Sequence, residues 1–458
     1  MRFLPHAVIA AALLAPAVAA AQVGPIAGDW YGTLKTPGPS LPIVFHIKPD
    51  GAATLDSPVQ HAMGLAATAT VADGKVRVAL QAMPAAFEGA LSPDGKTLNG
   101  QWTQGGGALP LVMSRAAPAA APTPNRPQTP QPPFPYRAED VTYVNPTSGL
   151  KLAGTLTLPQ GSGPFPAILL ITGSGTQDRD ETVFDHKPFL LIADALTRRG
   201  VAVLRVDDRG AGGSAPPLHS PTLDEDAGDI AASLAWLRAR PEIDKARVGL
   251  LGHSEGGSLA TKVAAHDPKV AFVVLMSAPG LNGGALIVDQ LGAILAASGA
   301  GEAEIKAAVS VERDLIDIAA SPQAPADALP AMNAVLDRQG LPADAQPRRE
   351  LPVMLSAHYR DFVRYDPKAD LARIRAPVLA IGGGKDTQVR AALNLPAIKA
   401  ALPASTDVTV RELPGLNHML QTAGTGLVAE YGQIEETMAP VALATIVDWT
   451  VAHAAKTR

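Results

Sequence analysis

From about residue 137 to the C-terminus, short continuous runs of Val, Ile and Leu alternate with helical stretches, and this pattern constrains the fold more than any other feature of the chain. Strands that are apolar on both sides are typical of a parallel sheet that helices cover on both faces. The pattern therefore predicts an α/β fold with a mostly parallel central sheet. The runs assigned to strands are residues 167–172, 201–206, 248–252, 271–276, 378–381 and 408–413.

Two further segments complete this expected fold. Residues 140–145 and 151–158 have the pattern of an antiparallel hairpin, which we expect at one edge of the sheet. Between residues 276 and 378 the alternation stops, and helical stretches such as 302–319 take its place. Because a structureless loop of this length is rare in a compact domain, we expect a helical cap at about 283–370, over the C-terminal edge of the sheet.

Residues 22–115 have a different, all-β pattern. Short apolar runs are separated by turn signals at regular intervals, which predicts a small barrel or sandwich. We expect Trp30, near its start, to pack inside this domain rather than to bind a ligand. The turn signals are Asp50-Gly51, Asp73-Gly74 and Asp94-Gly95.

Residues 116–136 form a predicted linker. Eight prolines fall between Pro118 and Pro135, mixed with Ala, Thr and Gln. Such a segment cannot bury an apolar core and favours extended polyproline geometry, although a ligand for a proline-binding partner is the alternative. We therefore expect the α/β domain to span residues 137–458.

Residues 1–21 are typical of a signal peptide. Arg2 supplies the positive end, an apolar run follows at 7–15, and small residues allow cleavage after Ala19 or Ala21. The run is too short to span a bilayer, and a buried N-terminal helix is the alternative. The sequence thus predicts an exported bacterial protein, periplasmic or secreted. The absence of cysteine excludes disulfides and thiolate metal sites.

Composition argues against several classes of partner. The formal net charge is −5 and no Lys/Arg cluster stands out, which disfavours nucleic-acid binding. No later stretch reaches transmembrane length without charges or breaks, so no membrane span is expected. Scattered His and carboxylate residues lack metal-binding spacing, so we expect neither a metal ion nor a cofactor. The oligomeric state is left open.

The segment 252–256, Gly-His-Ser-Glu-Gly, supplies the candidate nucleophile, Ser254. The G-x-S-x-G motif is weak by itself, but here it directly follows the apolar run 248–251 and directly precedes a helical stretch. The turn is so tight that side chains two residues on either side of Ser254 would collide, which explains the two glycines. The alternative is an ordinary strand–helix turn with a bystander serine.

Asp386 and His418 are the candidate partners of Ser254. A serine hydroxyl needs a base, and in this arrangement the chain order is serine, acid, histidine. Each candidate follows directly after a predicted strand. His418 would take the proton of Ser254 and return it to the leaving group, while Asp386 would hold the imidazole in the required tautomer. The alternatives are that Asp386 is a turn residue and that His418 is a loop residue, neither with a catalytic role.

The negative charge of a tetrahedral intermediate needs backbone N–H donors, known as an oxyanion hole. We expect one donor to be the N–H of Glu255, directly after the nucleophile. The second should come from the loop at 172–175, where Ser174 is favoured over Gly175. This loop lacks the pattern of a phosphate-binding loop.

Charged residues flank these motifs. Residues 207–209, Asp-Asp-Arg, follow a strand and are expected to pair near the site and to fix their loop. The run 178–181 either shapes the site or forms a solvated surface. His253 is expected to pack or to form hydrogen bonds rather than to act as a second base.

With these motifs in place, the chain resembles bacterial α/β-hydrolase esterases of the serine aminopeptidase and prolyl-oligopeptidase-like branch that carry a signal peptide and an extra N-terminal domain. The resemblance covers roughly residues 137–458. The chain departs from many relatives at Ile171-Thr172, where they have His-Gly, and at Arg390, where they have proline. The segments that carry the resemblance are 173–180, 208–214, 252–257, 364–367, 385–389 and 416–418.

This resemblance implies hydrolysis of a small-molecule carboxylic ester through an acyl-enzyme: Ser254 attacks, the alcohol leaves, and water activated by His418 releases the acid. Peptidases share this triad, so a short peptide or amide substrate is the alternative. In that case Glu302, Glu304 or Glu312 of the cap could hold a substrate amine. A third hypothesis is a non-catalytic binding protein that acts through its β-domain.

Overall fold

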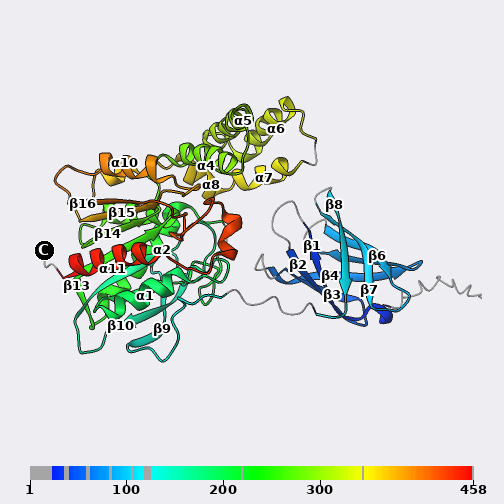
Figure 1. The fold of residues 1–458 in the computed structure, drawn as a ribbon, viewed down its shortest axis with the longest axis horizontal. Helices are drawn as coiled ribbons and strands as arrows, with labels where there is room; N and C mark the ends of the chain where they lie inside the picture. Colours follow the sequence, from blue (N-terminus) through cyan, green and yellow to red (C-terminus); the bar gives the residue numbers. More distant parts are fainter. Residues whose placement is uncertain are drawn as a thin grey trace, which may run out of the picture. The chain divides into compact units, whose positions relative to one another are not determined.

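The computed structural model describes residues 23–35, 41–57, 62–81, 85–104, 107–117, 125–217, 220–342 and 345–455. The signal peptide predicted at 1–21 lies outside these ranges. The chain divides into two compact units, Met1–Pro122 and Thr123–Arg458 (Figure 1). This division falls inside the segment predicted as a linker.

The first unit is a closed barrel of eight antiparallel strands, which confirms the all-β prediction and selects a barrel over a sandwich. Strands adjacent in the sequence pair with one another, and the first strand closes the barrel by pairing with the last. Closure leaves no free sheet edge. The strands are β1 (Gly28–Leu34), β2 (Leu41–Ile47), β3 (Ala52–Ser57), β4 (Ala62–Ala72), β5 (Lys75–Leu80), β6 (Ala85–Leu91), β7 (Thr97–Gln104) and β8 (Gly107–Ser114).

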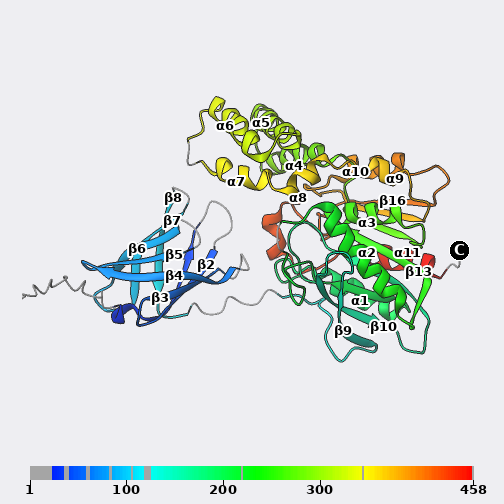
Figure 2. The same ribbon diagram turned by 180° about the vertical axis from the view of Figure 1, so that it is seen from behind.

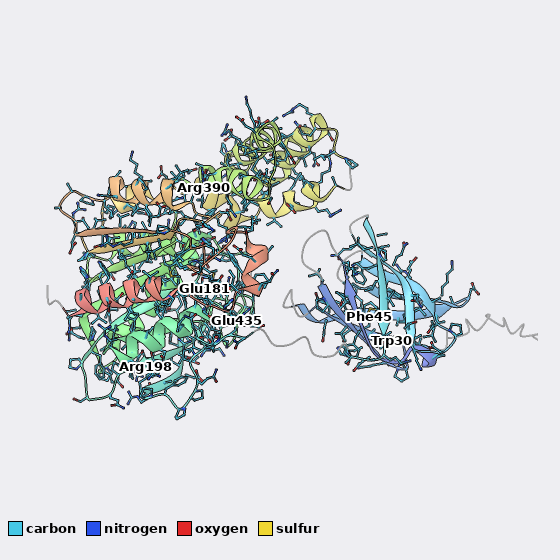
Figure 3. All side chains as sticks on the ribbon, viewed as in Figure 1. Trp30, Phe45, Glu181, Arg198, Arg390 and Glu435 are labelled. Atoms are coloured by element: carbon cyan, nitrogen blue, oxygen red, sulfur yellow. The ribbon has the colours of Figure 1, made fainter. Side chains whose placement is uncertain are left out.

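Large aromatic side chains fill the interior of this barrel. Trp30, Phe45 and Phe87 have no exposed surface, and Figure 3 shows the first two inside the barrel. The Trp30 indole N–H donates to the carbonyl oxygen of Ile26 at 2.7 Å, and the Arg115 guanidinium lies 4.2 Å from the ring centroid. Trp30 therefore packs in the core, as the sequence predicts.

The second unit contains an eight-stranded sheet with the strand order β16-β15-β14-β13-β11-β12-β10-β9. The six strands from β11 to β16 are parallel, and the β9–β10 hairpin adds two antiparallel strands at one edge. The mostly parallel sheet is thus confirmed. The bounds are β9 (Arg137–Val144), β10 (Lys151–Leu158), β11 (Phe165–Ile171), β12 (Ala202–Val206), β13 (Ile243–His253), β14 (Val273–Met276), β15 (Val378–Gly383) and β16 (Val408–Leu413).

Helices cover both faces of this sheet, as Figures 1 and 2 show from opposite sides. Successive residues of β11 point to opposite faces, so Ala167 and Leu169 enter one apolar core while Ile168 and Leu170 enter the other. Burial on both faces explains the continuous apolar runs in the sequence. One face carries α1 (Pro188–Arg198) and α11 (Pro440–Ala454), and the other carries α2 (Leu223–Ala239), α3 (Glu255–His266) and α10 (Ala391–Ala401).

The interval between β14 and β15 folds into helices, as predicted for a cap. Helix α8 packs tightly on the start of α4, where a Cβ atom on Gly283 would lie 2.0 Å from the carbonyl oxygen of Phe362. Glycine is therefore required at this crossing. The helices are α4 (Gly283–Ala297), α5 (Glu302–Ala320), α6 (Pro325–Arg338), α7 (Gln346–Met354), α8 (Ala357–Arg364) and the short α9 (Lys368–Leu371).

Part of the predicted linker is attached to the second unit, which begins at Thr123, ahead of residue 137. Arg126 donates to the carbonyl oxygens of Phe184, Gly432 and Ile434 at 2.8–3.2 Å. The segment has no apolar core of its own, but its side chains satisfy carbonyl groups around the 3₁₀ helix η3 (Val428–Gln433).

We expect Arg126→Ala in the full-length protein to lower the stability of the second unit by about 2 kcal/mol, because three carbonyl oxygens lose their donor. Thermal unfolding measures this loss. The matched control is Arg77→Ala in the barrel, whose guanidinium forms an exposed ion pair with Glu88 and should cost less than about 1 kcal/mol. If the two substitutions lowered stability equally, the inference that this segment stabilises the second unit would be wrong.

Candidate active site

Ser254 occupies a strained turn between β13 and α3. Its backbone dihedral angles are φ 52° and ψ −124°, a combination that non-glycine residues rarely adopt. The flanking glycines permit this turn. A Cβ atom on Gly252 would lie 2.1 Å from the carbonyl oxygen of Gly256, and a Cβ atom on Gly256 would lie 2.3 Å from the carbonyl oxygen of Thr172. The local geometry is that of the turn expected from the motif.

Asp386 and His418 form a buried hydrogen-bonded pair. His418 Nδ1 lies 2.8 Å from Asp386 Oδ2, and both residues are 4% exposed. The other carboxylate oxygen, Oδ1, accepts the backbone N–H groups of Gln388 and Val389, each at 2.8 Å. The carboxylate is therefore held in place from both sides and can orient the imidazole.

His418 lies beside the turn that carries Ser254. Its ring centroid is 4.7 Å from that of His253, the residue directly before Ser254. Its carbonyl oxygen accepts from Ser277 Oγ at 2.9 Å and lies 3.2 Å from His253 Nε2. The fold thus brings Asp386 and His418, which follow β15 and β16, to the end of β13.

Backbone donors surround the same position. Gly173 approaches so closely that a Cβ on it would lie 3.3 Å from Ser254 Cβ. The Gly173 N–H is already used, because it donates to Glu181 Oε1 at 2.7 Å. Within the described part of the chain, the N–H groups of Ser174 and Glu255 have no acceptor. These are the two donors that the sequence favours for an oxyanion hole.

The charged residues around the site have partners that the sequence did not identify. Asp207 and Arg209 do not pair with each other: Asp207 binds Arg179 at 2.6 Å, and Arg209 binds Asp229 at 2.7 Å. Glu181 is 1% exposed, so the run 178–181 shapes the site and is not a solvated surface. An ion pair to the loop at Arg179 and an ion pair to helix α2 at Asp229 replace the pairing expected within residues 207–209.

Thr172, where the chain departs from many relatives, has a tethering role. Its hydroxyl donates to Asp208 Oδ1 at 2.7 Å, and Asp208 Oδ2 accepts the backbone N–H of Gln177 at 2.8 Å. Asp208 therefore accepts hydrogen bonds from both ends of the loop that contains Ser174, at Thr172 and at Gln177. Burial raises the pKa of the Asp208 carboxyl to about 7.

A cavity of about 320 Å³ opens next to this loop and to Glu255. Apolar residues of the strands form its floor, α2 contributes mainly polar residues, and the cap contributes Ser356 and His358. His358 Nε2 lies 2.8 Å from Glu255 Oε1, and its Nδ1 lies 3.5 Å from Asp226 Oδ2. The neighbouring carboxylates of Asp226 and Glu255 raise the pKa of His358 to about 10. A charged bridge thus links the cap to the core.

The cap carboxylates considered for a substrate amine lie elsewhere. Glu302, Glu304 and Glu312 are on α5 and do not line the cavity, and the first two are exposed. The carboxylates that do line it include Asp226 and Glu255 from the core. The sequence could not show this, because the face that a cap helix presents to the cavity depends on how the cap folds back.

The described residues contain no cluster of three or more His, Asp or Glu side chains arranged to hold a metal ion. A search of the same residues for a helix with the length and hydropathy of a membrane span found none.

Comparisons with known proteins show that the chain is similar to several esterases and thioesterases. An esterase of Thermotoga maritima is 29% identical over 282 residues, which cover 61% of this chain and 61% of that protein. Human mitochondrial acyl-coenzyme A thioesterase 2 is 26% identical over 172 residues, or 38% of this chain and 32% of that protein. The chain thus spans less than two thirds of the length of these relatives.

Solved structures and family profiles give further matches. The α/β hydrolase GrgF from Penicillium is 17% identical and has a TM-score of 0.45; the match covers 70% of this chain and all of that one. The profile of the family described as X-Pro dipeptidyl-peptidase (S15 family) matches residues 148–401, which is more than half of the chain.

The His358 bridge predicts a pH dependence of stability. A histidine whose pKa is raised in the folded state stabilises the fold fully below its unfolded pKa of 6.5, and this contribution is lost as the pH rises through about 10. We expect His358→Gln to be less stable than the wild type by about 2 kcal/mol at pH 6, because Glu255 loses its cationic partner. The difference should shrink between pH 7 and pH 10.

Thermal unfolding of both proteins across this pH range measures the effect. A difference in melting temperature that stays constant, or that grows with pH, would show that His358 does not bridge the cap and the core as a cation.

Proposed function

We propose that this chain, which belongs to the X-Pro dipeptidyl-peptidase (S15) family, is a serine hydrolase that cleaves carboxylic esters. In this proposal Ser254 is the nucleophile, His418 is the general base, and Asp386 orients His418. The observation that carries the proposal is the buried Asp386–His418 hydrogen bond beside the strained turn at Ser254. The similar esterase of Thermotoga maritima supports an ester as substrate.

The proposed reaction starts with attack of Ser254 Oγ on the ester carbonyl carbon. Because His418 Nδ1 faces Asp386, its Nε2 is the nitrogen that takes the serine proton. The N–H groups of Glu255 and Ser174 then stabilise the negative oxygen of the tetrahedral intermediate. His418 returns its proton to the alcohol oxygen as the C–O bond breaks, which leaves an acyl-enzyme.

Water completes the cycle in the same site. His418 Nε2 takes a proton from the water as its oxygen attacks the acyl carbon, and a second tetrahedral intermediate forms. Its collapse breaks the bond to Ser254, which recovers its proton from His418. The products are the carboxylic acid and the free enzyme.

The cavity next to the oxyanion loop is the proposed substrate pocket, because Gly173 and Glu255, which flank Ser254, line it. Ser254, Asp386 and His418 are not among its lining residues. Its volume of about 320 Å³ is near the lower end of the range for small-molecule sites, which supports a short acyl group. The apolar floor suits this acyl group, and the polar wall formed with His358 lies next to Glu255.

A peptidase is the second candidate function. The family is described as a peptidase family, and the carboxylates of Asp226 and Glu255 line the cavity, where a substrate amine could bind. Both carboxylates already face His358, so an amine would have to compete with its imidazole.

Labelling with a fluorophosphonate tests the nucleophile. We expect the wild type to be labelled on Ser254 and Ser254→Ala to lose both labelling and esterase activity, because Ser254 is the proposed nucleophile. The matched control is Ser258→Ala, one turn further along α3, which removes a buried serine and should leave labelling intact. An unlabelled wild type would favour the non-catalytic hypothesis.

Parallel assays on p-nitrophenyl esters and aminoacyl p-nitroanilides separate the two candidate functions. We expect a higher kcat/KM for esters than for anilides, and among esters a higher value for acetate or butyrate than for long acyl chains, because the cavity is small. A preference for anilides with a free amine would reverse the assignment in favour of the peptidase.

A further inference from the structure

A second pair of ionisable residues, Glu181 and His253, lies buried beside the proposed catalytic residues. Glu181 is 1% exposed and His253 is 3% exposed, and the carboxylate oxygen Oε1 lies 2.8 Å from His253 Nδ1. Figure 3 shows Glu181 inside the second unit. Neither residue lines the substrate cavity, and the proposed reaction uses neither side chain.

The partners of His253 determine its protonation state. Its Nδ1 faces a carboxylate oxygen of Glu181, and its Nε2 faces the carbonyl oxygen of His418 at 3.2 Å. Both oxygens accept hydrogen bonds and neither donates. A neutral imidazole donates from only one nitrogen, so both contacts are satisfied only by the doubly protonated, positively charged ring.

The surroundings of Glu181 agree with an ionised carboxylate. Its Oε1 accepts two hydrogen bonds, from Gly173 N–H and from His253, and its Oε2 has no partner among the described residues. A proton on Oε2 would therefore be a buried donor without an acceptor. Burial lowers the pKa of His253, but the charge and hydrogen bond of Glu181 outweigh burial, and the pKa is raised.

This pair connects three loops that are far apart in the sequence. Glu181 holds the N–H of Gly173, directly before the proposed oxyanion donor Ser174. His253 directly precedes Ser254, and its Nε2 holds the carbonyl oxygen of His418. A shift of either side chain would therefore move the oxyanion loop relative to the general base.

We propose that Glu181 and His253 form a buried ion pair that positions the oxyanion loop and His418 for the chemical step. They are positioning residues, because neither contacts the reacting atoms. This inference rests on the proposed function. It also explains why only one of the two adjacent histidines serves as the base: with a proton on each nitrogen, His253 has no lone pair to accept another.

The principal test is Glu181→Gln in the full-length protein. The neutral side chain removes the charge that keeps His253 doubly protonated. Either one contact of His253 is then lost, or the glutamine amide turns its NH2 group to His253 and the Gly173 N–H loses its acceptor. We expect kcat for a p-nitrophenyl ester to fall about 10- to 100-fold, the usual effect of losing a residue that orients a catalytic group. KM should change by less than about twofold, because Glu181 does not line the cavity.

The matched control is Glu242→Gln. Glu242 is also ion-paired, with Arg137 and Arg240, but it lies just before β13, at the opposite edge of the sheet from Ser254. Its substitution should leave kcat unchanged. If Glu181→Gln keeps the wild-type kcat, or changes KM instead of kcat, the positioning role is wrong.

Nuclear magnetic resonance of the wild type with ¹⁵N-labelled histidine gives a readout independent of any variant's folding. We expect His253 to be an imidazolium with protons on both nitrogens at pH 7, as His358 is expected to be. The signals of His253 should disappear in His253→Gln and persist in His358→Gln. A neutral His253 at pH 7 would overturn the inference.

Two further measurements complete the design. If Glu181→Gln does not fold, the double variant Glu181→Gln/His253→Gln leaves no unpaired charge in the interior and should fold with the same loss of kcat.

Fluorophosphonate labelling of the wild type separates the ion-pair inference from the proposed function. Without labelling of Ser254 the proposed function fails, whereas labelling of Ser254 together with an unchanged kcat in the variants refutes only the ion-pair inference.

Discussion

The sharp turn at Ser254 is the constraint around which the rest of the site is arranged. Strand β13 ends and helix α3 begins on either side of this one residue, at a backbone conformation that costs on the order of 1–3 kcal/mol. The buried sheet on one side and the buried helix on the other hold it there. Because Gly252 and Gly256 meet backbone to backbone, the hydroxyl has a fixed position that other loops must approach.

Those loops are held by buried charges rather than by regular secondary structure. Arg179 binds Asp207, Arg205 binds Asp180, and Glu181 lies against His253. In a poorly polarisable interior, a charge that loses its partner costs several kcal/mol, so each pair resists displacement of either loop. This arrangement provides the rigidity that pre-organised donors need to stabilise developing charge.

Specificity depends on a different part of the second unit. The catalytic candidates follow strands of the sheet, whereas the cavity wall includes Ser356 and His358 of the cap. The bridge from His358 to Glu255 connects that wall to the residue whose N–H is a proposed oxyanion donor. In the proposed mechanism, Glu255 therefore links substrate selection to transition-state stabilisation.

The sequence by itself determined the mostly parallel sheet, the helical cap and the turn at Ser254, and it proposed Asp386 and His418. These features are encoded locally, by apolar runs and by residues that directly follow strands. Only the tertiary structure decided that Glu181 is buried against His253, that Asp226 and His358 share a cavity, and that Arg126 joins the second unit. Each of these contacts joins residues from about 70 to about 310 positions apart, so it depends on how whole elements pack, and no local pattern records it.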